Sequence, residues 1–490
     1  MPSLTVTTGS RSFISYTSGK VVFFRARCKA FTVRLRGVIS VAWRATSNHG
    51  GVDDGENARH ALVLACNAGR RPAGVGATCA ALCRGTGERR DANRTAAVGC
   101  AGSRVAASAG RSTAVAQAAP GCAWMRLDAL VRARPRDLDR DADGAIVMRG
   151  QIVALAPRPA ALQAAQSAGF VVAEQRRFDA LGLRVVVLRA PPGLATQQAM
   201  QRLRQLDPQG EYVYNHLYSE SQAGEASAAQ APPVPAQADA AAAFRVGLID
   251  SGVDPAHPAL AGVQVQRWGC GGGAPAQLHG TAVASLLAGR AVMHGPIART
   301  VYAADLYCGA PGDGAAVELV AALAWMAQQD VAVINISLVG EPNKLLARAV
   351  AALVARGHLL VAAVGNDGPA APPLYPASYP GVIGVSAVDA RLRVLPEAGR
   401  GSQVAFAAIG DLIAAAPQGQ WKRQRGTSFA APLVARIAAQ SLTQPDPQAA
   451  AALLAQLQRR AHDLGASGVD PVYGYGVLGE ELPLQREPGR

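Results

Sequence analysis

The chain has 490 residues, half of them apolar and only 17% charged, so it is long enough for two or three domains with a large core. Its net charge of +14 would suit a nucleic-acid partner, but the arginine excess lies mostly before residue 205, and charges nearly balance from Phe244 onward. With 5% aromatic residues and no stacking motif interleaved with the basic residues, the composition argues against nucleic-acid binding. No apolar run reaches about 18 residues, so the sequence predicts no transmembrane helix.

Residues 1–124 are rich in Ala, Gly, Arg and Ser, and they hold neither a helical nor a strand period for long. Three interpretations are open: a disordered extension, a poorly packed accessory region, or a mis-assigned start that translates non-coding sequence. We favour the last. Arginines interrupt the apolar stretch 31–45, so no signal peptide is visible, and a mis-assigned start would explain that too. Residues 125–147 are predicted to be a polar linker.

Residues 148–218 show regular periodicity and predict a small α+β domain. Strands are expected at 151–155, from 170, at 183–188 and at 211–214, with helices at 160–168 and 196–206. This β-α-β-β-α-β order is the ferredoxin-like plan. The following residues, 219–243, are rich in Ala, Gln and Pro, and we expect a solvated, extended linker.

Residues 244–482 alternate apolar strands with helices, which predicts an α/β domain. Continuous Val, Ile, Leu and Ala runs between helical segments indicate a parallel sheet that is covered on both faces. The expected elements are 244–249, 279–289, 301–307, 317–328, 331–337, 345–356, 359–364 and 382–388. Active sites of such sheets lie at the carboxyl ends of the strands, where Asp250 and Asn366 fall.

Three short segments place a carboxylate, an imidazole and a hydroxyl group at the ends of predicted elements. Asp250 ends a strand in LIDSG, His279 opens a helix in HGTAVA, and Ser428 opens another in GTSFAAP. A serine hydroxyl is a weak nucleophile until an imidazole accepts its proton, and that imidazole needs a carboxylate to fix its tautomer. We expect the helix N-terminus to keep the His279 ring neutral. Each segment alone is also typical of a turn or a helix cap.

A fourth segment, residues 361–368 (VAAVGNDG), predicts a strand that ends at Asn366. An amide at that place could donate a hydrogen bond to a tetrahedral oxyanion, together with the Ser428 backbone N–H. Asn-Asp-Gly is also a strong turn signal, which is the simpler alternative. Four such segments in one order indicate a shared catalytic site more strongly than four unrelated turns.

Cysteine positions and one acidic segment bear on disulfides and metals. Six of the eight cysteines precede residue 125, and Cys270 and Cys308 flank the His279 segment. This pair predicts either a disulfide in an oxidising compartment or two buried thiols. No CxxC pair or histidine cluster suggests zinc. Residues 139–144 (DRDADG) match half of a calcium loop, but Gly150 stands where the bidentate acid is needed, so we expect a solvated acidic turn.

These segments resemble those of the subtilisin-like serine proteases, the subtilases. The resemblance covers residues 244 to 482 and includes NISL at 335–338 and YGYGVL at 473–478. It implies a subtilisin-like parallel sheet flanked by helices. The site residues that it implies are Asp250, His279 and Ser428 as the catalytic triad, Asn366 as the oxyanion donor, and Ser337, Leu338, Val339 and Gly340 as a substrate-binding edge. Val339 stands where the family usually has glycine.

The same resemblance implies that residues 148–218 are an inhibitory propeptide-like domain, for which an ordinary accessory domain is the alternative. The predicted function is a serine endopeptidase that cuts polypeptide substrates through an acyl-enzyme. We expect a secreted or periplasmic zymogen that processes itself, with its own propeptide-like domain as a partner. No cofactor is required and no metal site is assigned, since calcium is common in the family but no ligands can be named here. The alternative function is an inactive, subtilase-fold binding protein, although no triad member is missing.

Overall fold

A computed structural model of the protein describes residues 129–220, 227–230, 244–290, 297–309 and 314–479, together with five short strands before residue 45. The chain forms two compact units, Met1–Gly99 and Cys100–Arg490. In the first unit, strands β1 (Thr5–Thr8), β2 (Ser12–Thr17) and β3 (Lys20–Val21) form an antiparallel sheet, and β4 (Ala30–Leu35) pairs with β5 (Ile39–Arg44). Apart from these strands, the predicted extension 1–124 lies outside the described residues, so its interpretation stays a prediction.

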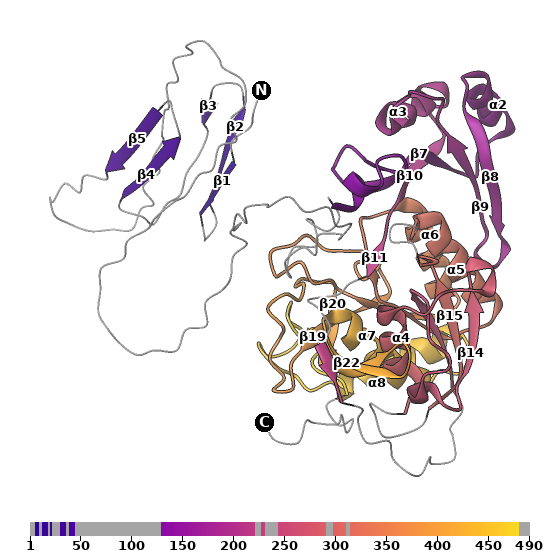
Figure 1. The fold of residues 1–490 in the computed structure, drawn as a ribbon, viewed down its shortest axis with the longest axis vertical. Helices are drawn as coiled ribbons and strands as arrows, with labels where there is room; N and C mark the ends of the chain where they lie inside the picture. Colours follow the sequence, from indigo (N-terminus) through magenta and orange to yellow (C-terminus); the bar gives the residue numbers. More distant parts are fainter. Residues whose placement is uncertain are drawn as a thin grey trace, which may run out of the picture. The chain divides into compact units, whose positions relative to one another are not determined.

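The second unit begins with the small α+β domain (Figure 1). Its sheet has the order β10-β7-β9-β8, with β6 added beside β7. The order of elements along the chain is the predicted ferredoxin-like one. The bounds are β6 (Leu138–Arg140), β7 (Ile146–Leu155), α2 (Pro159–Ser167), β8 (Val171–Phe178), β9 (Leu183–Arg189), α3 (Thr196–Leu206) and β10 (Glu211–His216).

Both faces of this small sheet are covered. Successive strand residues point to opposite faces, so Ile152 of β7 joins the buried cluster of α2 and α3. Its neighbour Val153 joins a different cluster, which contains residues of two helices from the second half of the chain, α5 (Ala316–Gln328) and α6 (Lys344–Ala355). The small domain therefore packs on α5 and α6 through the face that its own helices leave open.

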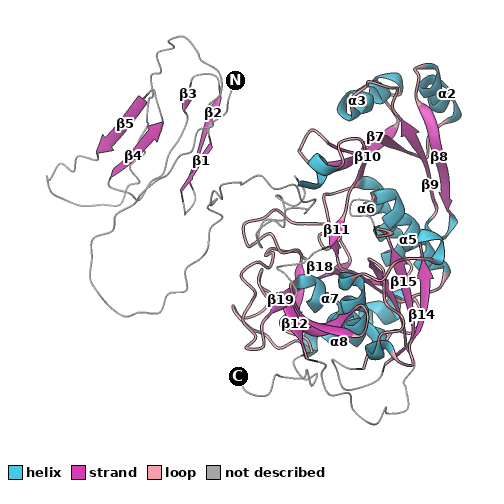
Figure 2. Ribbon diagram, viewed as in Figure 1, coloured by secondary structure: helices cyan, strands magenta, loops and turns pink. Residues whose placement is uncertain are grey.

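The core of the second half is a parallel sheet of seven strands with the order β14-β15-β13-β16-β18-β19-β20. This confirms the predicted α/β class, a parallel sheet flanked by helices (Figure 2). The bounds are β13 (Phe244–Asp250), β14 (Gln264–Trp268), β15 (Ala298–Asp305), β16 (Val333–Ile336), β18 (Leu359–Ala363), β19 (Val382–Val388) and β20 (Val404–Ile409). The sequence analysis did not predict β14 or β20.

Helices cover both faces of the large sheet. Leu248 of β13 lies in a buried cluster with residues of α4 (Leu278–Ala288) and α7 (Thr427–Ala439), while its neighbour Ile249 lies in the cluster of α5 and α6. A further helix, α8 (Pro447–Arg460), contributes Leu457 to the first cluster. Asp250 follows these residues directly, so the sheet delivers it to the carboxyl edge between the two helical layers.

Short strands join the two halves of the second unit. We expected residues 219–243 to be solvated, but β11 (Ser219–Glu220) pairs with β17 (Leu338–Val339), and β12 (Ser227–Ala229) pairs with β22 (Gln420–Arg425). β22 forms a hairpin with β21 (Asp411–Ala416) and leads into α7. In the described part of the chain, no helix combines the length and the apolar character that a membrane crossing requires.

Candidate active site

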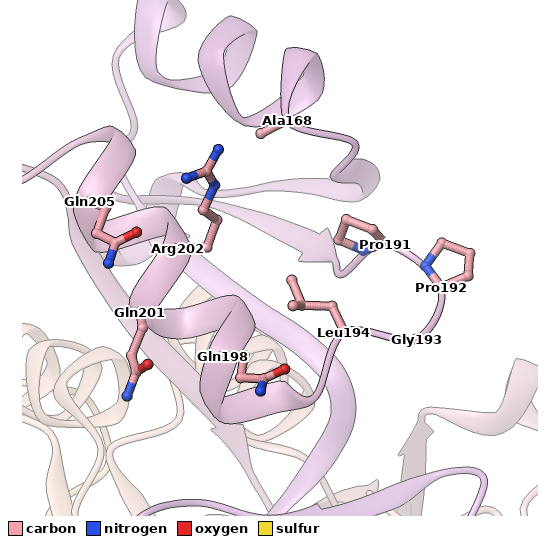
Figure 3. Close-up of a pocket in the computed structure, with 9 residues that line it drawn as sticks. All are labelled: Ala168, Pro191, Pro192, Gly193, Leu194, Gln198, Gln201, Arg202 and Gln205. Atoms are coloured by element: carbon pink, nitrogen blue, oxygen red, sulfur yellow. The ribbon is translucent and has the colours of Figure 1, made fainter.

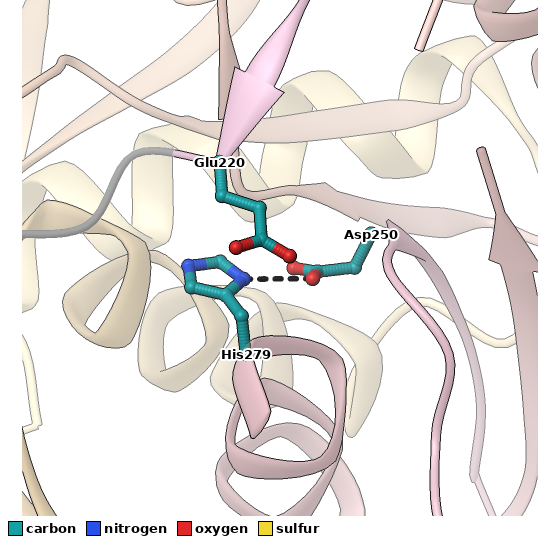
Figure 4. A group of neighbouring side chains, drawn as sticks. All are labelled: Glu220, Asp250 and His279. Atoms are coloured by element: carbon teal, nitrogen blue, oxygen red, sulfur yellow. Dashed lines mark hydrogen bonds and ion pairs between the residues drawn. The ribbon is translucent and has the colours of Figure 1, made fainter. Parts of the chain in front are cut away.

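Asp250 and His279 form a buried pair at the carboxyl edge of the sheet. The His279 Nδ1 lies 2.7 Å from Asp250 Oδ1, and both side chains are almost completely shielded from solvent (Figure 4). Oδ1 of Asp250 also accepts a hydrogen bond of 2.7 Å from the Ser251 N–H. This arrangement places the Nδ1 proton toward the carboxylate and leaves Nε2 as the ring nitrogen that can exchange a proton.

Gly280 explains why the helix that carries His279 can approach Asp250. A Cβ atom at Gly280 would lie 2.1 Å from the Ser251 carbonyl oxygen, which is backbone and has no room to move. The Gly280 N–H donates a hydrogen bond of 3.0 Å to Ser251 Oγ. Glycine at this position therefore allows α4 to dock on the strand end and brings His279 beside Asp250.

Ser428 lies on the first turn of α7, after Gly426, whose φ of 137° favours glycine. Its Oγ donates a hydrogen bond of 3.1 Å to the Ser337 carbonyl oxygen. The ring of the next residue, Phe429, packs 5.3 Å from the His279 ring. Nε2 of His279 has no hydrogen-bond partner in the described part of the chain, so the bond between Ser428 and His279 is not formed. The Ser428 hydroxyl must leave the Ser337 carbonyl before His279 can accept its proton.

Asn366 lies beside the N-terminus of α7. Its Oδ1 accepts a hydrogen bond of 3.0 Å from the Thr427 N–H, and the Thr427 hydroxyl accepts one of 3.2 Å from the Gly365 N–H. Because the Asn366 oxygen is turned toward Thr427, its NH₂ group is the end that can donate to an anion beside Ser428.

The predicted substrate-binding edge is occupied by another segment of the same chain. Ser219 is the Cα partner of Val339, and Glu220 is the partner of Leu338, in an antiparallel pairing. Gly340 pairs instead with Tyr375, through hydrogen bonds of 2.9 Å in both directions. Antiparallel addition of a strand to an exposed edge is the usual way in which an extended peptide is bound.

Glu220 was missed by the sequence analysis, which placed it in a linker. Figure 4 shows its carboxylate group next to both Asp250 and His279. One carboxylate oxygen of Glu220, one of Asp250 and a ring nitrogen of His279 lie within 4.8 Å of one another. Only the pairing of β11 with β17 brings Glu220 there. No local pattern around residue 220 could have revealed a contact that depends on this long-range pairing.

The electrostatics of the site centre on His279. Burial lowers the pKa of its imidazole, but the carboxylates of Asp250 and Glu220 raise it, and the resulting pKa is about 9. Burial also raises the pKa of the Glu220 carboxyl group. The expectation of a neutral His279 ring does not hold for this form of the chain, because the two nearby carboxylates outweigh the effect of burial.

Cys270 and Cys308 form a disulfide with their Cα atoms 5.2 Å apart, which decides between the two predicted alternatives. The bridge joins the chain after β14 to the chain after β15, where Asp305 lies. Oδ1 of Asp305 accepts hydrogen bonds from the backbone N–H groups of Tyr307 and Cys308, and burial raises the pKa of this carboxyl group. Asp305 is in register with Asp250 on the neighbouring strand, and the sequence analysis did not single it out.

Three features of the structure are candidates for a metal or ligand site. Glu220, Asp250 and His279 are the one set of three potential metal-ligating side chains found within the described ranges, but the hydrogen bond between Asp250 and His279 occupies Nδ1, so we assign no metal to them. In the acidic segment 139–144, Asp141 Oδ1 accepts hydrogen bonds from the N–H groups of Asp143 and Ala145, and its Oδ2 lies 3.0 Å from His216 Nε2. A hollow of about 530 Å³ on the small domain, lined by residues 168, 191–194, 198, 201, 202 and 205, contains none of the predicted site residues (Figure 3).

The fold and the site together indicate the class of enzyme to which the chain belongs. A buried Asp–His pair at the carboxyl edge of a parallel sheet, a serine on the first turn of the adjacent helix and an extended segment on the neighbouring edge are features of subtilisin-like serine peptidases. Comparisons with known proteins give the same assignment. The model of the subtilase family matches residues 241–476.

Individual relatives agree with this family. Subtilisin DY of Bacillus licheniformis is 30% identical over 267 residues, which are 52% of this chain and 96% of that protein. The minor extracellular protease Epr of Bacillus subtilis (strain 168) is 34% identical over 170 residues, or 34% of this chain and 26% of Epr. Fervidolysin from Fervidobacterium pennivorans, a keratinolytic enzyme related to subtilisin, shares the fold with a TM-score of 0.57 at 19% identity, over 70% of this chain and 62% of that one.

The chain belongs to the subtilase family, a family of serine-type endopeptidases. It spans 26% of Epr and 62% of fervidolysin, and the small domain lies outside the matched family region. Family membership therefore gives the class of chemistry. The roles of individual residues, the processing of the chain and its location are proposals.

Proposed function

We propose that the protein is a subtilisin-type endopeptidase in which Ser428 is the nucleophile and His279 the general base. His279 Nε2 takes the Ser428 proton while Oγ attacks the substrate carbonyl carbon, and the resulting oxyanion is bound by the Asn366 amide and the Ser428 backbone N–H. The C–N bond then breaks as His279 returns the proton to the leaving amine. Water releases the acyl group by the same route in reverse. Asp250 orients His279 and stabilises the imidazolium.

We further propose that the chain is made as a zymogen, with residues 148–218 as its propeptide-like domain. The contacts of this domain with the second half support this proposal. The Asn215 side chain accepts a hydrogen bond of 3.1 Å from the Val317 N–H at the start of α5. Asn343, which caps α6, donates through Nδ2 to the Tyr214 carbonyl and lies 2.9 Å from His216 Nδ1. The small domain therefore caps α5 directly and contacts the residue that caps α6, which suits a role in assisting the folding of these helices.

The observation that carries the zymogen proposal is the occupied substrate edge. Directly after the small domain, Ser219 and Glu220 pair with Val339 and Leu338, and Glu220 lies beside His279. A strand in this position blocks other peptides and also presents the following peptide bonds to the catalytic residues. The cut is therefore expected within a few residues after Glu220, inside the predicted linker 219–243.

The disulfide between Cys270 and Cys308 supports export to an oxidising compartment, because such bridges rarely persist in a reducing cytosol. We therefore propose a secreted or periplasmic enzyme that acts on polypeptides. Mass analysis of the native protein after thiol alkylation tests this part. An unmodified Cys270–Cys308 pair in the exported fraction supports it, whereas two alkylated thiols in a cytosolic fraction contradict it.

Intact-mass analysis of purified protein tests the function and the processing together. The wild type should shorten to a form that starts shortly after Glu220, and Ser428→Ala should stay uncut. Ser441→Ala, an exposed serine just after the same helix, is the matched control and should be processed like the wild type. A fluorophosphonate probe should label the wild type but not Ser428→Ala. The alternative, an inactive binding protein, predicts no labelling, and equal shortening of both forms would indicate a foreign protease.

A further inference from the structure

The side chain of Tyr218 fills a closed pocket between two edges of the catalytic half. The tyrosine is fully buried, and its N–H donates a hydrogen bond of 2.7 Å to the Gly314 carbonyl. Its own carbonyl accepts one of 3.0 Å from the Tyr307 hydroxyl. On the other side, the next two residues, Ser219 and Glu220, pair with β17. Tyr218 is therefore held as part of an extended peptide between β17 and the segment that leads into α5.

Two glycines shape this pocket around the tyrosine. A Cβ atom at Gly340 would lie 2.6 Å from Cδ1 of the Tyr218 ring, so only glycine leaves room for the ring there. A Cβ atom at Gly314 would lie 2.7 Å from the Tyr218 carbonyl oxygen and 2.8 Å from the Tyr307 ring. The pocket is thus matched to the backbone and to the ring of the residue that it holds.

The end of the pocket is polar and matches the phenol group. The Tyr218 hydroxyl donates a hydrogen bond of 2.8 Å to the Glu341 backbone carbonyl. Burial raises the pKa of this hydroxyl well above its ordinary value, so it keeps its proton and remains a donor. A phenylalanine in this pocket would lose this hydrogen bond and leave the Glu341 carbonyl without the donor that Tyr218 supplies.

The contacts of Tyr218 described above, with Tyr307, Gly314, Gly340 and Glu341, are made by the catalytic half, so these residues stay with the enzyme when the processing segment leaves. We infer that the pocket is a substrate subsite that selects tyrosine through its hydroxyl group, and that polypeptides cut by the mature enzyme carry tyrosine at the place of Tyr218. This inference rests on the proposed function, because substrates are expected to bind along the same edge as residues 218–220. A site built to bind a substrate hydroxyl discriminates against the analogue that lacks it more strongly than an apolar pocket can.

Peptide cleavage by the processed enzyme tests the inference. Three quenched fluorescent peptides carry residues 215–226 of this sequence (NHLYSESQAGEA), with Tyr, Phe or Ala at the place of Tyr218. We expect kcat/KM for the Phe peptide to be roughly tenfold to a hundredfold below that for the Tyr peptide. The Ala peptide, which fills none of the pocket, should be lower again.

Gly340→Ala provides a second, independent measurement. Its Cβ would occupy the space of the tyrosine ring, so the ratio of kcat/KM between the Tyr and Ala peptides should fall toward one, whatever happens to the overall rate. The inference is overturned if the Tyr and Phe peptides are cut equally well, or if Gly340→Ala keeps the wild-type ratio. Casein cleavage and fluorophosphonate labelling distinguish a failure of this inference from a failure of the proposed function. Their presence without tyrosine selectivity overturns this inference alone, whereas their absence overturns the proposed function as well.

Discussion

Replacing Glu220 by glutamine removes one carboxylate from beside the Asp250–His279 pair and keeps the size of the side chain. In the uncut chain the pKa of His279 is about 9, held up by Asp250 and Glu220. Below that pH the ring is mostly protonated and cannot accept the Ser428 proton. Self-processing should therefore accelerate as the pH rises toward 9, and Glu220→Gln should move this profile to lower pH.

The size of the shift follows from the distances. The nearest carboxylate oxygens of Glu220 and Asp250 and a ring nitrogen of His279 lie within 4.8 Å of one another. Unit charges about 5 Å apart interact by about 3 kcal/mol at an effective dielectric constant of about 20, which corresponds to about two pKa units. Burial raises the pKa of the Glu220 carboxyl group, which weakens its effect on His279, so we expect Glu220→Gln to lower the midpoint by roughly one unit. The midpoint then falls to about 8, and processing at pH 7 becomes roughly tenfold faster.

The assay follows the processed fraction by intact mass after the full chain is diluted from denaturant into buffers from about pH 6 to pH 10. Asp179→Asn is the matched control, since it removes one charge from an exposed carboxylate of the same small domain, paired only locally with Arg177. Asp250 and Asp305, the other carboxylates at the site, stay unchanged in both variants. If Glu220→Gln shows the same midpoint as the wild type and Asp179→Asn, Glu220 does not control the protonation of His279.

Three further substitutions test single contacts. Asn366→Ala should lower kcat by about 10²–10³ with little change in KM, and an unchanged kcat in peptide assays would exclude Asn366 as an oxyanion donor. Gly280→Ala should abolish labelling by a fluorophosphonate probe, because its Cβ would meet the Ser251 carbonyl at 2.1 Å, and wild-type labelling would contradict the need for this close approach. Asn343→Ala removes the α6 cap and the contact with His216 and should lower stability by about 1–2 kcal/mol, measured by denaturant unfolding of the Ser428→Ala precursor. An unchanged midpoint there would show that the cap is dispensable.

The parts of the fold that could be predicted are those whose pattern is local. Asp250 follows a strand of buried residues, and a helix of small residues follows His279, so both elements and their ends were evident from the sequence. Strands β14 and β22 were missed because their sequences, QVQRW and QWKRQR, are largely polar. Their strand conformation depends on the partner that pairs with them.

In the candidate site, too, the features with a local sequence pattern could be predicted and those that depend on distant contacts could not. The segments around Asp250, His279, Asn366 and Ser428 carry recognisable local patterns, but the state of the site depends on long-range contacts. Glu220 reaches His279 only because β11 pairs with an edge more than a hundred residues later in the chain. The raised pKa of His279 and the hydrogen bond from Ser428 to Ser337 follow from that assembled geometry. Local propensity contains no information on them.

The attachment of the chain on both sides of the catalytic residues has a kinetic consequence. Glu220 is fixed to β17, and Ser227 is fixed to β22, the strand that runs into the Ser428 helix. The proposed cut lies between these two anchor points, so the bond would meet the proposed nucleophile at a high effective concentration. Maturation should accordingly be a first-order event, with a half-time that does not change when the protein is diluted.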